Sequence, residues 1–259
     1  MENQSNETDK MNEKGTDCWL MPKVEQQDNL EKHLKQDFQV ERLAFFSDAI
    51  FAIAITLLVI EFKAPNITEN STVNDVLRQL ADLKYHFIAL LVSFGLIAMY
   101  WTQHHRLFKY IRNYNNQIII ANMCVLLPII FFPFTTTFVA ESFATIFQNP
   151  ENATVYFLGI NLFLLNNFFA MLASYVFYWI TMVKYKEMSY GMPKQEKIKI
   201  TFNSLFGTVL FAAMFVTISL SKSVFVFDLV ILPLLLVRII VGKKIIKSAR
   251  NKQMRNLNK

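Results

Sequence analysis

Residues 42–60 read Arg42-Leu-Ala-Phe-Phe-Ser-Asp-Ala-Ile-Phe-Ala-Ile-Ala-Ile-Thr-Leu-Leu-Val-Ile60. Between Leu43 and Phe62 the only charged residues are Asp48 and Glu61. This stretch has roughly 20 residues, which is the length that a helix needs to cross the hydrocarbon core of a membrane. A carboxylate in such a helix is costly, so Asp48 should face protein or water and have a role. We therefore predict a first membrane-spanning helix that is also the functional one.

The rest of the chain has the composition of a multi-pass membrane protein. Of its 259 residues, 53% are hydrophobic and only 18% are charged. Gly (6) and Pro (7) are scarce, which favours long uninterrupted helices. In lipid the backbone must satisfy its own hydrogen bonds, as helices do and open sheets do not. The expected fold class is all-α and integral to the membrane, with six transmembrane helices.

The predicted spans divide the chain into three regions. We expect a polar cytoplasmic tail over 1–40 that is partly disordered, a transmembrane domain over 41–242 and a basic cytoplasmic tail over 243–259. Residues 24–41 have apolar positions four apart, typical of a short amphipathic helix. That helix either lies on the membrane surface or is a solvated helix leading into the first span. The six spans are expected at about 43–62, 85–102, 118–139, 155–183, 200–220 and 224–241.

The distribution of basic residues predicts the orientation of these spans. The formal net charge is +6, and the bases gather in the loops after spans 2 and 4 and in the C-terminal tail. The loops after spans 1 and 3 carry acids and three glycosylation sequons, at Asn66, Asn70 and Asn152. Cytoplasmic loops are the basic ones, so both termini are predicted to be cytoplasmic.

The first span has two different edges on a helical wheel. With about 100° per residue, Ile53, Leu57 and Ile60 form one apolar stripe and Thr56 lies on its shoulder. The Ser-Asp pair of the same helix falls on the opposite side. Such a stripe is also typical of ordinary helix packing, so periodicity alone does not define a pore.

Asp48 has three possible roles: an ion or proton site, half of a buried pair, or a residue near the headgroups at the start of the helix. Its candidate partners are Trp101, His104 and Arg106, at the cytoplasmic end of span 2 and hence at the same depth. A hydrogen-bonded tie between spans 1 and 2 is the interpretation that we prefer over an ion ligand.

Motifs of catalysis are missing from the sequence. The chain has four His and no His/Asp/Glu set with the spacing of a catalytic metal site. It has no Gly-rich phosphate loop, no Gly-x-Ser-x-Gly elbow and no Thr-Val-Gly-Tyr-Gly filter. We therefore expect no enzyme, no bound metal, no cofactor and no nucleic-acid partner.

Several motifs resemble those of the transmembrane protein 175 family, potassium channels of endosomes and lysosomes and of prokaryotic membranes. The motif Arg42-x-x-x-Phe46-Ser47-Asp48, followed by an Ala/Ile/Leu helix, resembles the signature of that family. Trp101-x-x-His104-x-Arg106-Leu107-Phe108 is similar to the end of its second span, and Asn122 with Pro133-Phe134 to its third. The resemblance covers the first half of the chain; spans 4 to 6 match only in number and hydrophobicity.

The resemblance implies one six-span unit per subunit and four subunits around a central pore lined by span 1. It implies a filter of side chains in which Ile53, Leu57 and Ile60 form the constriction, with Thr56 beside them. It also implies a structural network around the first motif, whose members are Arg42, Phe46, Ser47, Asp48, Trp101, His104 and Arg106. In that network Ser47 and Asp48 join Trp101 and His104, and Arg42 holds the start of the helix.

These observations lead to a homotetrameric, potassium-permeable cation channel as the hypothesis, with potassium as the permeant ion and the lipid bilayer as its surroundings. The membrane would be the cell membrane in a prokaryote and an endosomal or lysosomal one in a eukaryote. The alternative is a secondary or proton-coupled transporter that uses Asp48 and His104. A membrane scaffold without transport is a third possibility.

The predicted orientation can be tested with a tag on the C-terminus. Because the basic tail is expected in the cytoplasm, added protease should digest the tag only after the membrane has been opened. Digestion of the tag on intact cells would contradict the predicted orientation.

Overall fold

The computed structural model describes residues 23–60, 67–69, 71–148 and 153–221, and all regular elements in these ranges are helical. This confirms the all-α class. The helices are α2 (Lys23–Ile60), α3 (Val73–Asp82), α4 (Lys84–Phe108), α5 (Asn116–Gln148), α6 (Ala153–Trp179), the π-helical turn η2 (Ile180–Lys184), the 3-10 turn η3 (Lys186–Met188) and α7 (Lys194–Ser221). Five stretches of the described chain, within α2 and from α3–α4, α5, α6–η2 and α7, are long and apolar enough to cross a membrane. Residues 1–22 of the predicted N-terminal tail, the predicted sixth span at 224–241 and the predicted C-terminal tail at 243–259 lie outside the described residues.

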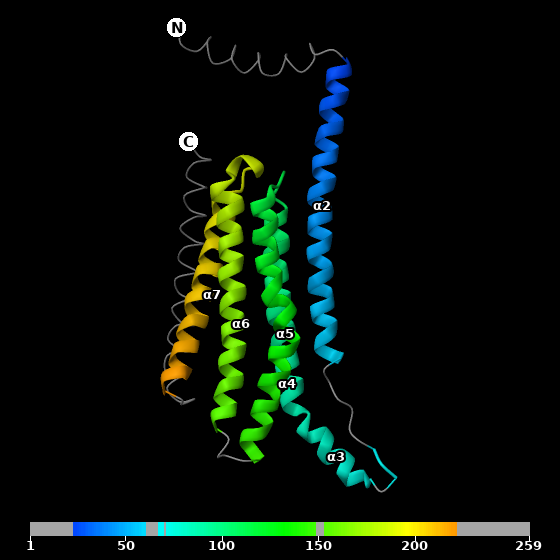
Figure 1. The fold of residues 1–259 in the computed structure, drawn as a ribbon, viewed down its shortest axis with the longest axis vertical. Coiled ribbons are helices and arrows are strands. Elements are labelled where there is room, and N and C mark those ends of the chain that lie inside the picture. Colours follow the sequence, from blue (N-terminus) through cyan, green and yellow to red (C-terminus); the bar gives the residue numbers. More distant parts are fainter. Residues whose placement is uncertain (1–22, 61–66, 70, 149–152, 222–259) are drawn as a thin grey trace, which may run out of the picture.

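Residues 23–60 form one continuous helix, drawn in blue in Figure 1. Of the two alternatives for residues 24–41, the continuous helix agrees with a helix that leads directly into the first span. No Gly or Pro occurs between Lys23 and Ile60, so nothing in the backbone interrupts the helical hydrogen bonds. A helix that lies on the membrane surface before span 1 is therefore not what the structure contains.

The long helices form a bundle with α5 at its centre (Figure 1). Helix α5 packs against α6, α2 and α4, and α6 packs against α7. The shared core is rich in aromatic side chains: Phe51 of α2, Tyr100 of α4 and Phe132 of α5 are fully buried in it. Among the described helices, α2 packs mainly against α4 and α5, and it stands on one side of the others.

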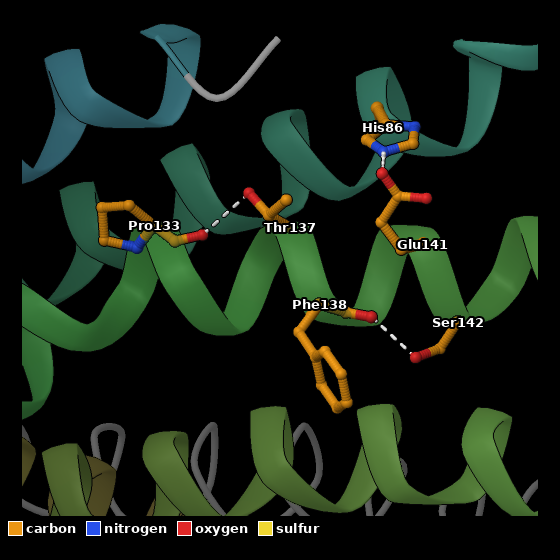
Figure 2. A network of polar contacts seen from close by, with 6 residues as sticks. All are labelled: His86, Pro133, Thr137, Phe138, Glu141 and Ser142. Carbon is orange, nitrogen blue, oxygen red and sulfur yellow. Dashed lines mark hydrogen bonds and ion pairs between the residues drawn. The ribbon is translucent and has the colours of Figure 1, made fainter. Parts of the chain in front are cut away.

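Helix α5 continues through two prolines, Pro128 and Pro133, as the sequence places them in the third span. A proline inside a helix removes a backbone donor and crowds the preceding turn. Side chains form hydrogen bonds with the carbonyls of both prolines. Asn166 of α6 donates its Nδ2–H to the Pro128 carbonyl at 3.1 Å. Thr137 donates its hydroxyl to the Pro133 carbonyl at 3.1 Å (Figure 2). The helix is thus held to α6 where the proline weakens it.

Helices α5 and α6 are in close contact at Gly159. A Cβ added to Gly159 would lie 2.6 Å from the Cβ of Ser142 and closer still to its hydroxyl. That hydroxyl donates to the Phe138 carbonyl at 2.7 Å, which holds Ser142 in place (Figure 2). Only a residue without a side chain fits at position 159.

Gly159→Ala should therefore destabilise the protein. Overpacking of a close contact typically costs about 1–3 kcal/mol, because the two backbones must move apart. The thermal unfolding midpoint in detergent, measured for Gly159→Ala and wild type, checks this. Gly95→Ala is the matched control, since a Cβ there would meet nothing within 4 Å. Equal midpoints for the two variants would contradict the packing argument.

Candidate functional site around helix α2

One face of α2 is buried against the bundle. Phe51, Ala54 and Leu58 are at most 3% exposed and belong to the central core. Their spacing of three and four residues is that of one helical face. Ile55 is partly buried and packs against the same core. The rotation of α2 about its axis is therefore set by large apolar side chains.

The opposite face of α2 carries the predicted apolar stripe, which is exposed in the described part of the chain. Ile53 is 56% exposed, Leu57 36% and Ile60 71%. Thr56 is also exposed, and its hydroxyl donates to the Ile53 carbonyl at 2.9 Å. The hydroxyl hydrogen is thus engaged along the helix, and the oxygen lone pairs remain free to accept from the outward side. The stripe carries no ionisable group, so it presents a dry surface with one hydroxyl.

A hydrogen bond joins α2 to α4 at Asp48. The indole Nε1–H of Trp101 donates to the Asp48 carboxylate at 2.8 Å. Trp101 also stacks on the His105 ring, with centroids 5.4 Å apart and an interplanar angle of 28°. A bond from an N–H to an ionised carboxylate is shorter and stronger than a neutral one. The structure therefore contains a tie between the first two spans, with Trp101 as the partner.

A second bond joins α2 to α5 at Ser47. Both Ser47 and Asn122 are completely buried, and the Asn122 side-chain N–H donates to the Ser47 hydroxyl at 2.9 Å. The Ser47 hydroxyl in turn lies 2.9 Å from the Leu43 carbonyl, to which it donates. Asn122 entered the sequence analysis only through its resemblance to a family motif, and its hydrogen bond to Ser47 was not predicted. The available signal was an amide within an apolar span, which is costly to bury unless it is hydrogen-bonded.

His104 does not take part in the predicted network with Ser47 and Asp48. Its ring packs among those of Phe51, Phe108 and Phe177, with centroids 4.9–5.4 Å apart, and the residue is 5% exposed. Its Nε2 has no hydrogen-bond partner within the described part of the chain. His104 is three positions after Trp101, so its side chain leaves α4 about 60° away from that of Trp101. There the His104 ring packs beside Phe177 of α6. In place of the single network that we expected, the structure contains two separate hydrogen-bonded ties, at Asp48 and at Ser47, and an aromatic cluster around His104.

The remaining predicted members of that network are on the surface. Arg42, Phe46 and Arg106 are exposed, and the structure shows no hydrogen bond from any of them to Asp48 in the ranges it describes. Phe46 is 47% exposed and lies on the same outward side of α2 as Ile53, seven residues away. No group of three or more His, Cys, Asp or Glu that could hold a metal ion occurs among the described residues.

The first half of the chain matches a known family. The family model described as endosomal/lysosomal potassium channel TMEM175 matches residues 42–133, which include both ties. A potassium channel of Chamaesiphon minutus is 38% identical over 100 residues, covering 39% of this chain and 49% of that protein. The endosomal/lysosomal proton channel TMEM175 of Bos taurus is 31% identical over 84 residues, 30% of this chain and 18% of that protein. Matches to the prokaryotic relatives therefore span about half of the relatives' length.

Solved structures extend the likeness beyond the first half. The crystal structure of a lysosomal potassium-selective channel TMEM175 homolog from Chamaesiphon minutus aligns with a TM-score of 0.57 at 25% identity, covering 76% of this chain and 97% of that chain. A crystal structure of another TMEM175 potassium channel shares the fold, with a TM-score of 0.54 at 19% identity, covering 78% of this chain and 93% of that chain.

The part of the chain that the family model matches, residues 42–133, contains both hydrogen-bonded ties. The bonds Asp48–Trp101 and Ser47–Asn122 join α2 to α4 and α2 to α5. Five apolar helices and the relatives together make the chain a multi-pass membrane protein. The family model, the relatives and the solved structures support the placement of this membrane protein in the TMEM175 family.

Proposed function

We propose that four copies of this chain form a potassium-permeable cation channel whose constriction is the outward stripe of α2. The observation that carries the proposal is the pair of opposite faces on one helix. One face is fixed in the bundle by Phe51 and its neighbours, and the other presents Ile53, Leu57 and Ile60 as exposed side chains among the described residues. Relatives named as potassium channels in prokaryotes support the permeant ion.

Lipid would also cover an apolar stripe, so the surroundings of the stripe decide between lipid and a pore. The Thr56 hydroxyl lies on the exposed face of α2, beside the stripe. Polar groups on a lipid-facing surface are costly, whereas polar groups beside a water-filled path are common. A pore axis along this face of α2 also explains why the helix stands apart from α6 and α7.

A ring of four apolar side chains would select ions by its radius. Such a constriction excludes water when it is narrow, and an ion must lose part of its hydration shell to pass. Potassium holds its water less tightly than sodium, so the ring favours potassium, to a modest degree. The Thr56 oxygen can replace part of the lost water, because its lone pairs are free to accept contacts.

The proposal includes the parts of the chain outside the described residues. A sixth span at 224–241 would bring the C-terminus to the same side as the N-terminus, and the basic loops would lie in the cytoplasm. The transmembrane channel domain would then cover 41–242, with a polar cytoplasmic tail over 1–40 and a basic one over 243–259. The location would be the cell membrane in a prokaryote.

The proton-coupled transporter that uses Asp48 and His104 fits the structure less well. His104 is enclosed by three aromatic rings, and Asp48 accepts from Trp101. The two residues are therefore not arranged as a relay along the exposed face of α2. Since the animal relatives are named proton channels, the recordings below should include a proton gradient.

Ile53→Asn should raise conductance and bring the potassium/sodium permeability ratio close to one. In a four-fold ring the substitution introduces four amides where water is excluded, which removes the dewetting barrier. Thr56→Ala should weaken discrimination without closing the channel. Reversal potentials of the purified protein under bi-ionic potassium/sodium conditions measure both effects.

Ile55→Asn is the matched control for the stripe. Ile55 packs against the core rather than facing outward, so an amide there should lower the yield of folded protein and leave selectivity unchanged. If Ile53→Asn keeps wild-type selectivity while Ile55→Asn abolishes it, the pore is on the other face of α2.

Asp48→Ala should reduce the amount of folded tetramer. The substitution leaves the Trp101 indole N–H without its acceptor, at a cost of about 1–3 kcal/mol. The measurement is the tetramer peak in size-exclusion chromatography for Asp48→Ala, Trp101→Phe and the double variant. For a tie, the double variant should lose little more than either single variant, because the two changes remove the same bond. Normal assembly of Asp48→Ala with altered selectivity would make Asp48 an ion ligand instead.

A further inference from the structure

Helix α3 has an apolar face that is exposed among the residues the structure describes. Val73, Leu77 and Leu80 are 76%, 57% and 49% exposed, and they lie within about 60° of one another on a helical wheel. Asp75 and Arg78 project from the other side of the helix. The main neighbour of α3 within the chain is α4, which it touches through few residues. A ten-residue helix with so sharp a division between apolar and polar faces is built to pack against something.

The N-terminus of α3 is well defined by its own side chains. The Asp75 N–H donates to the Thr72 hydroxyl at 3.3 Å, and the Thr72 N–H donates to the Asp75 carboxylate at 3.0 Å, which together make a capping box. Capping favours a helix, but isolated helices shorter than about 12 residues are marginal in water. A partner on the apolar face would supply the stabilisation that the short helix lacks.

The place of α3 in the fold indicates which partner that is. Figure 1 shows α3 leaving the end of α4 and projecting from the bundle on the side where α2 stands. We proposed above that the exposed face of α2 lines an axis shared by four chains. On that arrangement α3 points toward the neighbouring chains rather than toward lipid.

The charges of α3 also fit a protein partner better than a lipid surface. Helices that lie on membranes are rich in Lys and Arg on the polar face and carry Trp, Phe or Leu on the other. Helix α3 has one base, Arg78, against two acids, Asp75 and Asp82, and it has no aromatic residue. Exposed apolar side chains of α4 next to α3, Phe87 and Ile88, offer a matching surface on the neighbouring copy.

We propose that the apolar face of α3 docks on an adjacent copy of this chain, so that four α3 helices form a collar at the outer end of the channel. The inference rests on the proposed tetramer. It assigns to Val73, Leu77 and Leu80 an intersubunit contact separate from the constriction. The residue most diagnostic of the contact is Leu77, in the middle of the face.

Photo-crosslinking from α3 tests this proposal. The photoreactive amino acid p-benzoyl-phenylalanine, placed at Leu77 in the full chain in vesicles of phosphatidylcholine and phosphatidylglycerol, should give a covalent dimer on irradiation. The same amino acid at Arg78 is the control, because it occupies the same depth on the polar face. The dimer band should be strong from Leu77 and absent or several-fold weaker from Arg78. Peptide mass spectrometry should place the attachment near Phe87 and Ile88.

Two other results would overturn the collar. An adduct with the mass of one chain plus one phospholipid from Leu77 would mean that the helix lies in the membrane surface. Equal dimer yields from Leu77 and Arg78 would mean unspecific collision. Native mass spectrometry of the same samples separates this from the proposed function. A tetramer of the 30.2 kDa chain with no Leu77 crosslink rejects the collar alone, whereas absence of a tetramer rejects the proposed channel assembly as well.

Discussion

The rotation of α2 about its own axis is the constraint on which the proposed pore depends. Two hydrogen bonds, one of them buried, and a row of apolar side chains set that rotation together. Trp101 holds Asp48 from α4, Asn122 holds Ser47 from α5, and Phe51 inserts into the core between them. A turn of α2 by one residue, about 100°, would break both bonds and bury the stripe. The outward direction of Ile53 therefore follows from contacts on the other side of the helix.

These contacts lie toward the N-terminal end of the span, whereas the stripe extends toward its C-terminal end. Ser47 and Asp48 precede Ile53 by more than one helical turn, and Ile60 is two turns further. The ties therefore fix the helix without placing polar groups inside the constriction. This separation lets one helix carry both the hydrogen-bonded residues and the apolar side chains of the proposed constriction. Buried polar groups need hydrogen-bond partners, whereas a constriction that excludes water needs apolar side chains.

The aromatic side chains give the bundle its rigidity around this anchor. His104 fills a space among three phenylalanine rings, and Tyr100 is buried with its hydroxyl donating to the Asn167 side-chain oxygen at 3.1 Å. Gly159 lets α5 and α6 approach closely near Phe138 and Ser142. The helix that carries Asn122 is thereby held from its far side, which keeps the second tie in register.

The sequence by itself determined the helical class, the first span and the phase of its stripe, because a period of 3.6 residues and the cost of charge in lipid are local properties. It also identified Trp101 as a partner of Asp48 through their expected common depth. It did not determine that Ser47 pairs with Asn122 or that His104 leaves the network. Those features depend on how each helix is rotated against its neighbours, and only the tertiary packing of large side chains decides that rotation.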